Sequence, residues 1–337
     1  MKALIPIDNF NIEKPFILGG INFIPASEYQ NVMLKQKNMA IPKLVITDKL
    51  SAYEYTDESL RDLGSILTGI QIEDVWSMTV AVIELNWSDT GYYSNNKRED
   101  EKMLMDACNV VDRVLDVVRV SFSRMDNPLM NPGIPGLLRT GYSGMIIINP
   151  DTENEYRIVG SRLYGLTMVS GIGLDLNNDN IDSLVEDEFI SVLECDDGNY
   201  VSLLSKLALK RLSEAMYIPL IDSKFIYLMT TIETLASQQY LPFKKVKPRI
   251  IPLLVNTKEQ YHSMSEELRI FSEDIRTEIV HNGKSLTDIQ NNEYKKILLK
   301  LQSIIARLAL ALYKSNCSTE EELDNYRQQK MENMGII

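Results

Sequence analysis

The period of the hydrophobic residues changes once along this chain, and no other sequence feature constrains the fold as much. Before about residue 198, the apolar residues form short runs rich in β-branched side chains, separated by glycines and prolines. Such runs are typical of β-strands. From residue 199 onward, apolar residues recur at every third or fourth position, as in amphipathic helices. We therefore expect an α+β protein with a β-rich mixed domain at 1–198 and an all-α helical bundle at 199–337.

The pattern also predicts individual elements. In the first domain we expect strands at 16–18, 21–24, 43–47, 70–87, 144–149 and 156–171, helices at 57–69 and 99–122, and an irregular loop at 124–144. In the second we expect helices at 200–217, 222–240, 247–256, 259–281, 287–314 and 318–333, joined by short loops as in an up-and-down bundle. Asp222 and Thr287 are candidate N-caps, and 318–322 resembles a capping box.

Composition excludes several classes of protein. No apolar run reaches the roughly 18 residues that a membrane span needs, and the start lacks the apolar core of a signal peptide, so we expect a cytoplasmic protein. The 3 cysteines are isolated and there are only 2 histidines, which argues against a disulfide framework and against a zinc or other transition-metal site. We expect no cofactor. Residues 175–186 place acidic or amide side chains as in a calcium loop, but Asn180 stands where the turn glycine belongs. We interpret that segment as a solvated acidic turn.

The net charge of -12 is unevenly distributed. Residues 1–199 hold 16 Lys and Arg against 31 Asp and Glu, a net charge of -15, whereas residues 200–337 hold 19 against 16, a net charge of +3. Between two predicted helices lies a basic cluster formed by Lys244, Lys245, Lys247 and Arg249. This cluster could contact a phosphate backbone, or it could be a solvated loop that happens to be basic.

The segment 265–286 carries the candidate chemistry. Its apolar stripe predicts the buried face of a helix and consists of Leu268, Phe271, Ile275 and Ile279. Asn282 and Gly283 are suited to ending that helix. Arg276 and His281 therefore fall near its C-terminus, where a protonated histidine is favoured and can act as acid or base. On a regular helix the two side chains point about 140° apart, so a shared site needs a loosened last turn or a second copy of the helix.

The sequence Arg-Thr-Glu-Ile-Val-His-Asn-Gly at 276–283 resembles the Arg-x4-6-His motif of the HEPN domains, most closely the ApeA-like group. The helix at 225–236, which carries Glu233, is similar to the Glu-bearing helix that precedes the motif in that group. The resemblance covers roughly 200–315. One departure is Thr277, since many members carry Asn, Asp or His directly after the arginine.

The resemblance implies a metal-independent endoribonuclease whose symmetric homodimer brings both Arg-His sets into one cleft. His281 would then transfer protons and Arg276 would bind the scissile phosphate. Glu233 lies in an apolar run, where an unpaired carboxylate is costly, so we expect it to partner Arg276. Asn282 and Lys284 would contact the RNA backbone near the cut. Two structural alternatives stay open: a purely structural ion pair between Arg276 and Glu233, and a His281 that only caps the helix.

The ApeA-like group also implies a role in anti-phage defence, with RNA cleavage as the effector step. The acidic first domain would then sense a phage-derived trigger or a regulatory partner. Two other functions remain as alternatives. The bundle could be a non-catalytic module that binds RNA or nucleotide, or the chain could be a toxin subunit that a partner protein keeps silent.

Overall fold

The computed structural model describes residues 1–26, 75, 77–87, 96–138, 141–149, 151, 156–161, 173–195, 198–237 and 239–337. Contacts group these residues into two compact units: Met1–Leu115 with Leu129–Glu186, and Asp116–Pro128 with Asp187–Ile337. This grouping divides the chain after Glu186 rather than after residue 198, and it assigns the segment 116–128 to the second unit. The domain boundary after residue 198 stays a prediction. The predicted strand at 43–47 and the helix at 57–69 lie outside the described residues.

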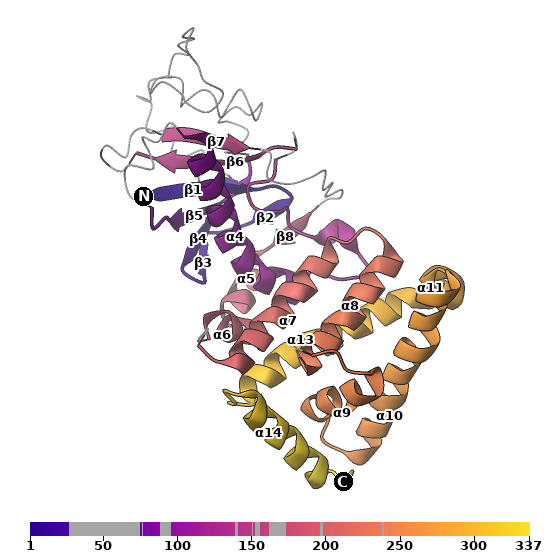
Figure 1. The fold of residues 1–337 in the computed structure, drawn as a ribbon. Helices are drawn as coiled ribbons and strands as arrows, with labels where there is room; N and C mark the ends of the chain where they lie inside the picture. Colours follow the sequence, from indigo (N-terminus) through magenta and orange to yellow (C-terminus); the bar gives the residue numbers. More distant parts are fainter. Residues whose placement is uncertain are drawn as a thin grey trace. The chain divides into compact units, whose positions relative to one another are not determined.

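The first unit contains two β-sheets (Figure 1). The strands of the two sheets are β1 (Lys2–Ile7), β2 (Phe10–Ile12), β3 (Phe16–Leu18), β4 (Ile21–Ile24), β5 (Thr79–Glu84), β6 (Ser143–Ile148), β7 (Tyr156–Ser161) and β8 (Leu174–Leu176). Six of them form one antiparallel sheet in the order β3-β4-β5-β1-β6-β7, and β2 pairs with β8 in parallel. The predicted pairing of two strands around residue 150 is confirmed by β6 and β7. β5 is shorter than the strand predicted at 70–87, part of which lies outside the described residues.

Helix α4 (Lys97–Phe122) confirms the long helix predicted at 99–122. It is tied to β7 by Arg157, whose Nη1 and Nη2 donate hydrogen bonds of 2.9 and 2.7 Å to the two carboxylate oxygens of Asp100. The acidic turn predicted at 175–186 is wrong, because β8 extends to Leu176 and α5 (Asn178–Val185) begins two residues later. Asn177 and Asn180 form a capping box that nucleates this helix.

The second unit is built of helices. They are α6 (Glu188–Glu194), α7 (Tyr200–Met216), α8 (Ile221–Ala236), α9 (Phe243–Leu254), α10 (Lys258–Arg269), the π-helical segment η3 (Ile270–Ile275), α11 (Arg276–Asn282), α12 (Leu286–Gln290), the 3₁₀ turn η4 (Asn291–Glu293), α13 (Tyr294–Lys314) and α14 (Glu320–Asn333). Helix α13 buries an apolar face and packs against α7, α8 and α9. The predicted α+β class is confirmed. Within the described ranges, no helix combines the length and apolar character needed to cross a membrane.

The helix ends correct two predicted N-caps. Helix α8 begins after Leu220, which provides no side-chain cap, so Asp222 lies inside its first turn. The Asp222 carboxylate instead accepts a 2.7 Å hydrogen bond from the backbone N–H of Leu286, at the start of α12. Ser285, not Thr287, caps α12. The capping box predicted at 318–322 is confirmed by Thr319 and Glu322 at the start of α14.

Candidate active site

Arg276 and His281 lie on α11, directly after a change in helix type. The backbone N–H of Arg276 bonds to the carbonyl of Phe271, five residues earlier, which is the π-helical pattern of η3. From Arg276 to Asn282 the helix is α-helical again. The turn between Arg276 and His281 is therefore not loosened. Their side chains leave the helix about 140° apart, as a five-residue separation on a regular helix requires.

The π-helical segment also changes which residues are buried. Leu268, Phe271 and Ile275 are buried, but Ile279 is only half-buried and α11 contains no buried residue. The prediction of a buried Ile279 was thus wrong. In a π-helix each backbone hydrogen bond spans five residues instead of four, so each residue rotates the chain less about the helix axis. Side chains after the segment therefore point in a different direction from the one that a continuous α-helix would give them. As a result α11 is largely accessible, and Val280 is 55% exposed.

Arg276 forms an ion pair with Glu233 on α8, through Nη1 and Oε1. Both side chains are partly accessible, with 31% of Arg276 and 22% of Glu233 exposed. The sequence predicted this partnership. The contact is equally compatible with a purely structural role, because it joins α8 and α11, which are distant in sequence.

His281 is exposed, and it makes no hydrogen bond or ion pair with any residue that the structure describes. The helix end is closed by the backbone instead. Gly283 adopts the left-handed conformation with φ of 66°, and the N–H groups of Gly283 and Lys284 both bond to the carbonyl of Glu278. The alternative in which His281 caps the helix carbonyls is therefore not realised in this structure.

Glu278 organises the predicted RNA-contacting residues, and the sequence interpretation missed it. Its carboxylate forms a 2.5 Å ion pair with Lys284 and accepts a 2.9 Å hydrogen bond from Asn282 Nδ2. These two interactions, with Lys284 first, lower the pKa of the Glu278 carboxyl. The spacing of four residues between Glu278 and Asn282 could have indicated the contact, because such residues are neighbours on a helix. Lys284, three residues after His281 in the chain, therefore has much of its charge compensated by Glu278.

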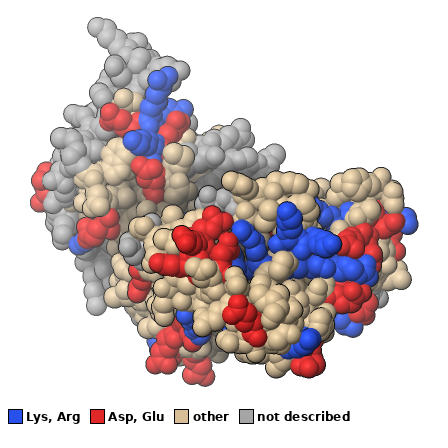
Figure 2. Space-filling view, turned by 60° about the horizontal axis from the view of Figure 1, so that its bottom comes forward, with Lys and Arg blue, Asp and Glu red and all other residues tan. Residues whose placement is uncertain are grey.

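The helix predicted at 247–256 begins earlier, at Phe243, so Lys244 and Lys245 lie in the first turn of α9 and not in a loop before it. Pro248 and Pro252 lie inside this helix, where proline is usually disfavoured. Lys244 and Lys245 are exposed, Lys247 is half-buried, and neither Lys244 nor Lys245 has an ion-pair partner among the described residues. Figure 2 shows that Lys and Arg side chains gather over one area of the helical unit, next to groups of Asp and Glu.

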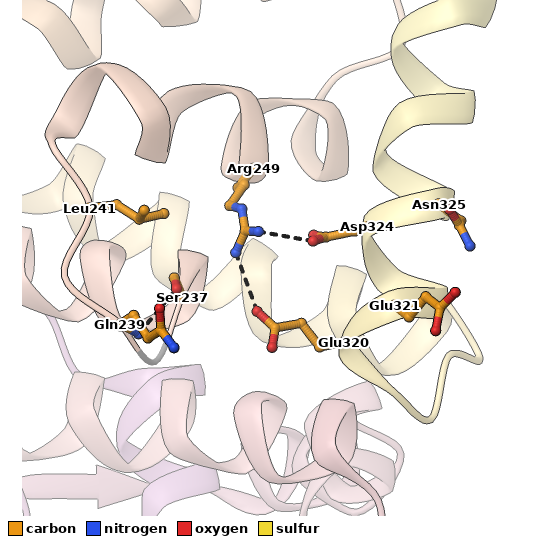
Figure 3. A pocket seen from close by; sticks show the side chains of 8 residues that line it. All are labelled: Ser237, Gln239, Leu241, Arg249, Glu320, Glu321, Asp324 and Asn325. Carbon is orange, nitrogen blue, oxygen red and sulfur yellow. Dashed lines mark hydrogen bonds and ion pairs between the residues drawn. The ribbon is translucent and has the colours of Figure 1, made fainter.

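Arg249, the fourth predicted basic residue, is engaged within the fold. Its guanidinium donates hydrogen bonds to Glu320 at 3.3 Å, to Asp324 at 2.9 Å and to the carbonyl of Ala236 at 3.1 Å. It thereby ties α9 to α14. In Figure 3 its side chain points between these two carboxylates.

Arg249 also lines a cavity of about 630 Å³. The other lining residues are Ser237, Gln239, Leu241, Glu320, Glu321, Asp324 and Asn325. Three carboxylates against one guanidinium repel an anion, so this cavity is not suited to an RNA phosphate. Within the described ranges, no group of three or more His, Cys, Asp or Glu side chains is placed to hold a metal ion.

Comparisons with protein-family models, with curated proteins and with solved structures found no match to this chain. The functional argument therefore rests on the geometry of the site and on the sequence motif at 276–283.

Proposed function

We propose that this chain is a metal-independent endoribonuclease that acts as a homodimer. The observation that carries the proposal is the state of α11: an exposed His281 without a hydrogen-bond or ion-pair partner among the described residues lies one and a half turns after a partly exposed Arg276. An accessible imidazole and a guanidinium are the groups that RNA cleavage without a metal requires.

The chemistry assigns each residue a role. The 2′-oxygen of the ribose attacks the adjacent phosphorus after losing its proton, and the bond from phosphorus to the 5′-oxygen breaks. His281 accepts the proton of the 2′-hydroxyl, and the imidazolium so formed donates a proton to the departing 5′-oxygen, because imidazole carries out both steps near neutral pH. Arg276 offsets the negative charge that builds on the phosphate. Glu233 positions Arg276, and Asn282 and Lys284 lie beside His281 in the chain, where the RNA backbone would pass.

A single chain supplies only part of this site. Because Arg276 and His281 point about 140° apart on an unloosened helix, one phosphate does not reach both on the same copy. A second copy of α11 related by a twofold axis would place the Arg276 of one chain opposite the His281 of the other. The exposed Val280, between these two residues, supports α11 as a surface for that partner.

For the cellular role we propose an anti-phage defence effector, in which the N-terminal unit responds to a phage-derived trigger or a regulatory partner. This part of the proposal rests on the resemblance of 276–283 to the HEPN motif.

The activity test is cleavage of RNA by the purified protein in the presence of EDTA. We expect the His281→Ala variant to lose about 100- to 10,000-fold in cleavage rate, the usual contribution of a general acid or base. His262→Ala is the matched control, because His262 is the other histidine of the chain and is also exposed. Tight RNA binding without products from the unmodified protein would instead support a non-catalytic binding module. Cleavage that is equal in both variants would remove His281 from the mechanism.

A further inference from the structure

The turn before α9 and the first turn of that helix present an unusual surface. Tyr240 is 90% exposed, the largest value among the exposed large hydrophobic residues that the structure describes. Lys244 and Lys245 follow four and five residues later and are also exposed. Together these three residues define what we call the Tyr240 surface.

The stability of the helix does not explain the two lysines. A helix N-terminus carries partial positive charge, so acidic or capping side chains stabilise it and lysines do not. Helix α9 has no acidic residue in its first turn, and Pro242 at the N-cap offers no side-chain hydrogen bond. Neither lysine is paired within the described part of the chain, so no contact there compensates for placing two positive charges at a helix N-terminus. Such an exception to local rules is expected at a functional surface.

We propose that the Tyr240 surface binds single-stranded RNA, with the tyrosine ring stacked on one base and Lys244 and Lys245 on neighbouring phosphates. Exposed aromatic rings beside basic side chains are the elements that proteins use to hold single strands. A duplex fits poorly, because its bases are already stacked on each other and cannot cover the ring. This inference rests on the proposed ribonuclease function for the identity of the polymer, and it adds the strandedness of the substrate and a binding site outside the Arg276–His281 helix.

The surface lies within reach of the candidate active site. Glu233, which holds Arg276, is three residues before the end of α8 at Ala236, and Tyr240 follows four residues later. If residues 233–236 rise as an α-helix and residues 236–240 are fully extended, the Cα atoms of Glu233 and Tyr240 are at most about 19 Å apart. One strand of RNA can therefore contact both.

Equilibrium binding of labelled RNA to the full-length His281→Ala protein tests this inference without interference from cleavage. Tyr240→Ala should weaken binding of an unstructured single strand by about 5- to 150-fold, the usual range for one stacked base. Tyr240→Phe should bind like the parent, because it keeps the ring. Tyr313→Ala, which removes a 37% exposed ring from α13, is the matched control and should have no effect.

The salt dependence of RNA binding distinguishes the contribution of the two lysines from that of the Tyr240 ring. Replacing Lys244 and Lys245 by alanine should reduce the slope of log affinity against log salt by about 1.4, since each phosphate contact to a single strand contributes about 0.7. Tyr240→Ala should leave that slope unchanged. The control pair Lys210→Ala with Lys314→Ala removes the same charge from exposed lysines that are paired with Glu214 and Glu188.

The outcomes distinguish this inference from the function on which it rests. Parent-like binding by Tyr240→Ala, or equal affinity for a perfect duplex, would overturn the inference even if the unmodified protein cleaves RNA. Loss of binding in Tyr240→Ala together with no cleavage by the unmodified protein would support the binding surface and overturn the ribonuclease proposal.

Discussion

Arg276 has hydrogen-bonding capacity beyond its contact with Glu233. A guanidinium offers five N–H donors in a planar fork, and within the described residues only Nη1 of Arg276 is engaged. With 31% of the side chain exposed, the remaining donors are available to a phosphate that approaches from solvent. Glu233 therefore orients the fork and leaves most of it free, which a positioning residue must do.

Replacing Glu233 by glutamine tests whether that orientation matters for cleavage. Glutamine keeps the size and one acceptor oxygen but removes the charge, so the fork is held less firmly. We expect the cleavage rate to fall by up to about 100-fold, as for other small misplacements of catalytic groups. The free energy of unfolding should change by about 1 kcal/mol or less, because the pair is partly solvated.

Glu267→Gln is the matched control for that variant, because Glu267 forms a 3.1 Å ion pair with Lys300 between α10 and α13 in the same unit. Stability is expected to change similarly in both variants, while cleavage changes only in Glu233→Gln. If Glu233→Gln lowered stability and left cleavage intact, the Arg276–Glu233 contact would be a structural ion pair only.

At the level of elements, the sequence predicted a helix end correctly where that end depends only on neighbouring residues. The Thr319–Glu322 capping box and the end of α11 at Gly283 depend on residues within one turn, and both occur as predicted. The role of Asp222 was mispredicted, because its hydrogen-bond partner is Leu286, 64 residues away. A suitable capping residue next to a helix does not reveal which helix it caps.

The π-helical segment could not be predicted from the hydrophobic period. Leu268, Phe271 and Ile275 fit a regular α-helix, and only the backbone hydrogen bond from Arg276 to Phe271 and the partial exposure of Ile279 distinguish the segment from one. For the site, the sequence predicted that Arg276 pairs with Glu233. It missed the contacts of Glu278, and it did not indicate that Arg249 binds α14, since that contact requires the fold.

Gly283→Ala tests the contribution of the helix end to the site. Gly283 has φ of +66°, and no atom of the described residues lies within 4 Å of the position that the Cβ of an alanine would occupy. An alanine there would therefore cause backbone strain but no clash. We expect a loss of about 1 to 2 kcal/mol in the free energy of unfolding. Because strain at this position frays the turn that carries His281, the cleavage rate should fall as well.

Gly335→Ala provides a matched control, because Gly335 has the same φ of +66° and the same open space but follows α14. Chemical denaturation should show similar destabilisation of the two variants, and the cleavage assay should show a loss for Gly283→Ala alone. Equal cleavage by both would mean that the end of α11 does not position the catalytic group.

On the scale of the whole molecule, charge and symmetry both bear on where RNA can bind. Residues 1–199 carry a net charge of -15 and residues 200–337 a net charge of +3, so the proposed RNA substrate would be repelled by the first part and attracted to the second. Within the second part, the regular α11 separates Arg276 from His281 on one chain. The central claim is therefore that a functional site takes its arginine and its histidine from different copies.

Mixing two inactive variants measures that claim most directly. Arg276→Ala and His281→Ala chains, carrying different tags, would be co-expressed and the mixed dimers assayed for RNA cleavage in EDTA. Each mixed dimer keeps one of its two composite sites, so the isolated mixed dimers should show about half of the unmodified activity per dimer. In the unsorted mixture only about half of the dimers are mixed, so about a quarter of the activity should return. Cleavage that stays at the level of either variant alone, or a protein that sediments only as a monomer at active concentrations, would contradict the account.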